Sequence, residues 1–167
     1  MTPKAQAITR ALSALQRPIR EFPDLIHLAP PVTNPDNSIN DVVVALSRNP
    51  SARTVFVTDA ADRLLGSISE RELDLDLITL VLPQQLWSEI REWDRRELMR
   101  AAHGNARTAR DLMTRVEALT PDKPLREALT MMSHRKDSVV PLVDDHERLL
   151  GYLTLFETLA LLMKTLA

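Results

Sequence analysis

Residues 59–73, DAADRLLGSISEREL, and residues 144–158, DDHERLLGYLTLFET, are two versions of one pattern. Aligned from their first residues, they share Asp59 with Asp144, Arg63–Gly66 with Arg148–Gly151, and Glu72 with Glu157. The chain has only 3 glycines, and two of them, Gly66 and Gly151, stand at matching positions. An internal duplication explains this coincidence better than two unrelated hairpins do.

Each copy predicts the same order of elements. A helix with apolar residues at steps of three and four precedes a β-rich run, a polar turn, a second strand and a final helix. The predicted ranges are 39–46, 54–58, 63–68 and 73–78 in the first copy and 125–132, 138–143, 148–153 and 160–163 in the second. A short strand before each first helix, near 32–33 and 116–119, completes a β-α-β-β-α unit.

The predicted fold class is therefore α+β. Three strands with two helices on one face leave the other face of the sheet uncovered. We expect the two units to bury these faces against each other, sheet to sheet, about a pseudo-twofold axis.

Two further segments flank the repeats. Residues 4–20 place Ala5, Ile8, Leu12, Leu15 and Ile19 at helical steps, which predicts an amphipathic N-terminal helix. A helical insertion between the repeats contains both tryptophans and several arginines; it either covers a flank of the fold or docks a partner. The predicted domains are 1–23 (N-terminal helix), 24–82 (first repeat), 83–107 (insertion) and 108–167 (second repeat).

Composition excludes several classes of protein. The net charge of -2 gives no general attraction for nucleic acid, and 4% aromatic residues leave little for stacking on bases. The absence of cysteine excludes disulfides and thiolate chemistry. No apolar run approaches the roughly 20 residues that span a bilayer. We expect a soluble, cytoplasmic protein that binds no nucleic acid.

The patterns of catalytic and metal sites are missing from the sequence. The four histidines lack metal-ligand spacing, and neither a G-x-S-x-G elbow nor a Walker sequence occurs. No pair of carboxylates stands in an apolar setting that would separate their pKa values. We expect no enzyme activity and no metal centre.

Three motifs of the second copy resemble the CBS domain, the module named for cystathionine β-synthase. They are D-L-M-T at 111–114, T-P-D-x-P-L-x-E-A-L at 120–129 and V-V-P-L-V-D-x-x-x-R-L-L-G-Y-L-T at 139–154. The first copy is a weaker match, with Asp24–Ile26 and Val55–Val57 in place of two of these motifs. Two copies in tandem resemble a CBS pair, or Bateman module.

The resemblance implies two clefts between paired units that bind adenosine nucleotides or adenosyl compounds. Backbone of the first and second strands holds the base, and a G-x-h-[ST]-x-x-[DN] motif supplies a hydroxyl and an acid for the ribose and phosphate. Here the motif spans 66–72 and 151–157, with Glu in place of Asp or Asn in both copies. The residues also admit another interpretation, because Ser-x-x-Glu and Thr-x-x-Glu are capping boxes.

Basic residues ahead of the second strand meet the phosphates in nucleotide-sensing members of the family. Arg53 and Arg71 would serve in the first copy, and Arg135 in the second; alternatively these are solvated charges. The candidate ligand-binding residues are Thr33, Arg53, Val55, Ser69, Arg71 and Glu72 in the first site and Arg135, Val140, Thr154 and Glu157 in the second. Phe156 stands in the second copy where the first has Arg71, which favours the first site for an anion.

The resemblance implies a non-catalytic regulatory sensor. Its ligand would be AMP, ADP, ATP or S-adenosylmethionine, none of them a required cofactor. A homodimer is expected, and the output would pass to a separate effector protein. The alternative is a structural dimerisation or docking module that binds no nucleotide and recognises its partner through the insertion. The double Glu substitution favours this alternative.

Overall fold

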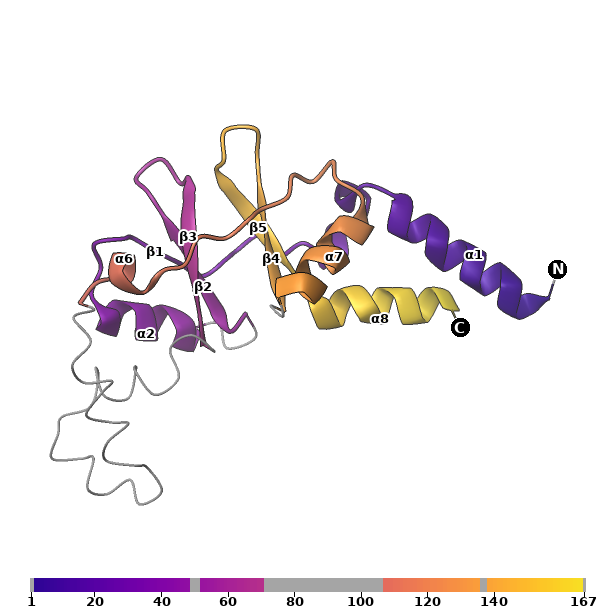
Figure 1. The fold of residues 1–167 in the computed structure, drawn as a ribbon, viewed down its shortest axis with the longest axis horizontal. Helices are drawn as coiled ribbons and strands as arrows, with labels where there is room; N and C mark the ends of the chain where they lie inside the picture. Colours follow the sequence, from indigo (N-terminus) through magenta and orange to yellow (C-terminus); the bar gives the residue numbers. More distant parts are fainter. Residues whose placement is uncertain (1, 49–51, 71–106, 136–137, 167) are drawn as a thin grey trace, which may run out of the picture. The chain divides into compact units, whose positions relative to one another are not determined.

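The structure is a computed structural model that describes residues 2–48, 52–70, 107–135 and 138–166 (Figure 1). It divides into two compact units. One, here called the first-repeat unit, consists of residues 31–61 and 65–116. The other, the second-repeat unit, consists of residues 1–30, 62–64 and 117–167.

The first-repeat unit is built on a three-stranded sheet. Its elements are β1 (Val32–Thr33), α2 (Ile39–Arg48), β2 (Thr54–Thr58), β3 (Leu64–Ser69) and α6 (Ala109–Leu112). The strand order is β1-β2-β3, and β1 runs parallel to β2 with Val32 opposite Phe56. Every residue of β2 is buried, as expected of a central strand. The core of the unit comprises Val42, Val55, Val57, Ile68 and Ala109.

The second-repeat unit contains a two-stranded antiparallel sheet. Its elements are α1 (Pro3–Gln16), the 3-10 turns η1 (Ile19–Glu21) and η2 (Pro23–Leu25), α7 (Leu125–Arg135), β4 (Val139–Val143), β5 (Leu149–Thr154) and α8 (Leu155–Leu166). On the free edge of β4, a parallel bridge joins Leu119 to Leu142. The Leu119 backbone N–H donates to the Pro141 carbonyl at 3.1 Å, so this segment takes the place of a third strand.

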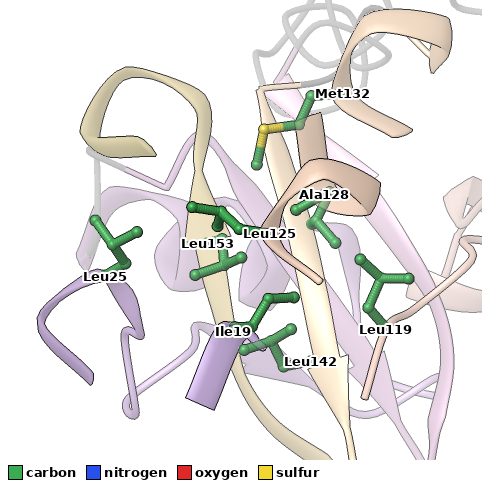
Figure 2. Close-up of a cluster of buried hydrophobic side chains, with 9 residues drawn as sticks. Ile19, Leu25, Leu119, Leu125, Ala128, Met132, Leu142 and Leu153 are labelled. Carbon is green, nitrogen blue, oxygen red and sulfur yellow. The ribbon is translucent and has the colours of Figure 1, made fainter. Parts of the chain in front are cut away.

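The core of the second-repeat unit draws on segments from both ends of the chain. Figure 2 shows apolar side chains from the N-terminal turns, α7, β4 and β5 packed together. They are Ile19, Leu25, Leu119, Leu125, Ala128, Met132, Val140, Leu142 and Leu153. Because η1 and η2 supply Ile19 and Leu25, the residues that precede β1 are part of this unit.

The two units share one feature: in each, a segment from one repeat pairs with a strand of the other repeat. In the second-repeat unit, His27 and Tyr152 exchange both backbone hydrogen bonds, at 3.0 and 3.1 Å. In the first-repeat unit, Ser67 and Thr114 do the same at 2.9 Å in each direction. The entry segment of each predicted repeat, 24–82 or 108–167, thus pairs with β-structure of the other repeat. The compact units are therefore discontinuous in the chain.

Most predicted elements are confirmed. The α+β class, β1, β2 and the starts of α2 and α7 agree with the sequence prediction, while β3 and β5 lie one residue further along than expected. The first copy's final helix and the insertion over 83–107 lie outside the described residues. Within the described ranges, no helix has the length and apolarity needed to cross a membrane.

The predicted N-terminal stripe is wrong. Helix α1 stops at Gln16 because Arg17, at φ -77° and ψ 146°, is extended before a proline. Ile19 therefore falls in η1, where it is fully buried. Of the predicted stripe, Ile8 and Leu12 are 46% and 57% exposed. The buried positions of α1 are instead the small residues Ala7, Ala11 and Ala14.

Candidate functional site

In the second-repeat unit, the candidate acid and hydroxyl meet where β5 ends and α8 begins. Thr154 is the last residue of β5, and Glu157 lies on the first turn of α8. The Thr154 Oγ1 hydroxyl donates to Glu157 Oε2. The same oxygen lies 2.6 Å from His27 Nε2. A carboxylate oxygen thus faces two potential donors, one from an element more than a hundred residues away in sequence.

His27 is held in place by three contacts other than its contact with Glu157. Its ring stacks on Tyr152 with centroids 4.7 Å apart and planes inclined by 16°. Its backbone makes the two hydrogen bonds to Tyr152 described above. This approach requires a glycine just before Tyr152 in β5, because a Cβ on Gly151 would lie 2.5 Å from the His27 carbonyl oxygen. The imidazole is therefore placed against Glu157 by the backbone of the sheet.

The contacts of Glu157 differ from those of the predicted capping box. In such a box the glutamate accepts from the backbone N–H of the capping residue. Within the described residues, Glu157 instead bonds the Thr154 side chain and faces His27. Ser38 and Asp41 show the reciprocal pattern at the start of α2: Ser38 N–H donates to Asp41 Oδ2 at 3.0 Å, and Asp41 N–H donates to Ser38 Oγ at 3.3 Å.

The pKa of Glu157 is lowered from its ordinary value. Partial burial raises this pKa, but the hydrogen bonds from Thr154 and His27 and the attraction of the imidazole together outweigh that effect. Glu157 is therefore ionised at neutral pH, with its side chain 47% exposed. An ionised, accessible carboxylate is a strong acceptor for hydroxyl groups.

Two other predicted residues of the second site lie on the elements before this junction. Val140 is on β4 opposite Leu153, one step along the ladder from Thr154. Its side chain is buried in the core, so only its backbone is placed to meet a ligand. Arg135 is the last residue of α7, and its side chain lies outside the described part of the structure.

In the first-repeat unit, Arg53 is bound by a neighbouring acid. Its Nε donates to Glu70 Oε2 at 2.6 Å and its terminal nitrogen to Oε1 at 3.2 Å. The Glu70 backbone N–H also donates to the Arg53 carbonyl at 2.8 Å. The side-chain hydrogen bond between them is the main cause of both pKa shifts. It raises the pKa of Arg53 and lowers the pKa of Glu70. An anion that used Arg53 would have to share it with Glu70.

The remaining first-site residues are placed as follows. Ser69 ends β3 next to Glu70. Thr33 and Val55 lie on the adjacent strands β1 and β2, and both are buried. Thr33 Oγ1 accepts a hydrogen bond from Asn37 Nδ2 at 3.1 Å. Arg71 and Glu72 lie outside the described residues.

Comparison with known protein families identifies the second copy of the duplicated pattern. The family model of the CBS domain matches residues 109–164. The chain therefore contains a CBS domain. No curated protein sequence matches the chain.

Solved structures extend the likeness of this CBS-domain protein to a CBS pair. A CBS domain-containing protein from Thermotoga maritima is 24% identical, with a TM-score of 0.66 over 89% of this chain and 96% of that one. CBSX2 of Arabidopsis thaliana, solved in complex with AMP, is 21% identical, with a TM-score of 0.65 over 89% and 97% of the two chains. The CBS pair of protein MJ0100, solved with 5′-methylthioadenosine and S-adenosyl-L-methionine, is 21% identical, with a TM-score of 0.60 over 88% and 95%. At these identities the likeness shows the fold.

Sequence reasoning about this CBS-domain protein missed His27. The residue lies at the entry of the first copy, ahead of β1, so the repeat pattern gave no reason to place it beside Glu157. The available signal was the match between Asp24–Ile26 and Asp111–Met113, which places His27 one step after a recurring motif. Separately, within the described residues no group of three or more His, Asp or Glu side chains is arranged to hold a metal ion.

Proposed function

We propose that the chain is a non-catalytic regulatory module that binds an adenosine nucleotide or adenosyl compound and signals to a separate protein. The observation that carries the proposal is the pairing of Thr154 with an ionised Glu157 at a strand-to-helix junction of a CBS fold. Ribose hydroxyls can donate to such a carboxylate. The adenosine ligands of the structurally similar CBSX2 and MJ0100 support this class of ligand.

The first-repeat unit is the better candidate for a phosphorylated ligand. Its motif carries Arg71 next to Glu72, with Ser69 at the end of β3. In the second-repeat unit the position of Arg71 is occupied by Phe156, which is 76% exposed and offers no charge to an anion. AMP, ADP or ATP would therefore bind first in the site of Ser69, Arg71 and Glu72. Ligand binding would favour one conformation of the protein over others, and the effector protein would respond to that change.

The test is a thermal-shift series with AMP, ADP, ATP and S-adenosylmethionine, with and without magnesium. Ligand at a hundredfold excess over its dissociation constant adds about 2.7 kcal/mol of stability. In a chain of this length that displaces the melting temperature by roughly 5 to 10 °C. We expect Glu72→Ala to abolish the shift and Glu157→Ala to retain it. The absence of a shift with every adenosine compound would favour a docking module that binds no nucleotide.

We also propose that the protein forms a homodimer through the exposed apolar side of α8. Phe156, Leu159, Met163 and Leu166 recur along this helix and are 76%, 40%, 69% and 47% exposed. Such a stripe is costly to leave in water, and a second copy can cover it with the same stripe. α1 packs against α8 and leaves Ile8 and Leu12 exposed as well.

Sedimentation analysis of Met163→Ser tests the dimer. Burial of a methionine side chain is worth about 1.5–3 kcal/mol, so its loss should raise the dissociation constant roughly tenfold or more. Val44→Ser is the matched control, because Val44 is 47% exposed and lies on α2 of the first-repeat unit. A monomeric wild-type protein, or equal effects of the two substitutions, would contradict this interface.

A further inference from the structure

His27 occupies a position that has a counterpart in the other repeat unit. Backbone bridges place His27 against Tyr152 in the second-repeat unit and Thr114 against Ser67 in the first-repeat unit. The nearest atoms to a Cβ on Gly151 and on Gly66 are likewise the carbonyl oxygens of His27 and Thr114, each at 2.5 Å. The two residues therefore occupy equivalent positions. One carries an imidazole and the other carries a short hydroxyl side chain.

The imidazole binds the oxygen that a ribose would use. A vicinal diol donates two hydrogen bonds, which a carboxylate accepts most readily with one oxygen each. In the second-repeat unit, Glu157 Oε2 already faces Thr154 Oγ1 and His27 Nε2. Full engagement of a diol therefore requires the His27 contact with Oε2 to break or lengthen.

The contact is accessible and weak enough to be displaced. The His27 and Glu157 side chains are 36% and 47% exposed, so both can be reached from solvent. Ion pairs of this exposure contribute little to stability, because water screens them. A ligand can thus break the contact between His27 and Glu157, and the free energy needed for this lowers the affinity of the ligand.

We infer that His27 competes with the ligand for Glu157 and thereby weakens ligand binding in the second-repeat unit. The inference rests on the proposed function, since it concerns the regulation of the same ligand sites. At the equivalent position in the other unit, Thr114 carries no ring nitrogen.

The test is calorimetric titration of the full chain with AMP. His27→Phe keeps a ring for Tyr152 and removes Nε2, whereas Thr114→Val alters the equivalent position. We expect His27→Phe to tighten AMP binding at the second-repeat site roughly two- to fivefold, the range for the contribution of an exposed pair. Adding Glu157→Gln to His27→Phe should remove this gain, and Thr114→Val should not reproduce it.

The outcomes separate this inference from the proposed function. If the wild type binds AMP and His27→Phe leaves the affinity unchanged or weakens binding, His27 is not a competitor. The proposed function would then stand without it. If the wild type binds no AMP at the second site but His27→Phe does, the inference is supported. If neither protein binds AMP, ADP, ATP or S-adenosylmethionine, both the proposed function and the inference are contradicted.

Discussion

Gly151→Ala should destabilise the protein by about 1–3 kcal/mol, the usual effect of forcing an extra methyl group into a packed site. The new Cβ would lie 2.5 Å from the carbonyl oxygen of His27. The backbone N–H and carbonyl of His27 are both hydrogen-bonded to Tyr152. The carbonyl oxygen therefore cannot move aside without breaking this bridge. Urea denaturation followed by circular dichroism measures the effect.

Two controls define what the Gly151 result means. Asp145→Ala changes an exposed turn residue near β5 and should shift stability by less than about 0.5 kcal/mol. Gly66→Ala, whose Cβ would lie 2.5 Å from the Thr114 carbonyl oxygen, should behave like Gly151→Ala. A neutral Gly151→Ala would mean that the segment around His27 does not approach β5 so closely.

Ile19→Ala should cost about 2–5 kcal/mol, the range for truncating a fully buried isoleucine. Ile19 has no exposed surface and lies in the core of the second-repeat unit with Leu125 and Leu142 (Figure 2). The matched control is Ile8→Ala, since Ile8 lies on α1 and is 46% exposed. Its substitution should cost well under half as much. Equal effects in thermal or urea unfolding would contradict the inclusion of the N-terminal turns in this core.

The repeat made much of the fold predictable. The hydrophobic periodicity of 39–46 and 125–132 predicts α2 and α7 because one face of each helix is buried. The β-rich run 54–58 coincides with β2, all of whose residues are buried. The recurring Gly66 and Gly151 marked positions of close backbone approach, although the sequence did not say what approaches them.

What the sequence did not predict depends on contacts between distant segments. The local periodicity predicted an apolar stripe that continued to Ile19. In the structure the helix ends before Pro18, and Ile19 enters the core from the following turn, η1. The buried positions of α1 are the small residues Ala7, Ala11 and Ala14. A search for large apolar side chains overlooks such a face.

The candidate site was predictable in part for the same reason. The motif identified Thr154 and Glu157, which the structure brings into contact. It could not identify His27, whose position depends on pairing with a strand far along the chain. It also gave no sign that Arg53 binds Glu70, because that ion pair forms only when β2 and β3 lie side by side.

The central proposal is that this CBS-domain protein binds an adenosine compound through the acids of its two motifs. Isothermal titration calorimetry with AMP and S-adenosylmethionine, on the wild type and on the double variant Glu72→Ala/Glu157→Ala, tests it most directly. Saturable binding to the wild type and its loss in a double variant that remains folded by circular dichroism is the predicted result. No heat of binding to the wild type at millimolar ligand, or equal binding by both proteins, would contradict it.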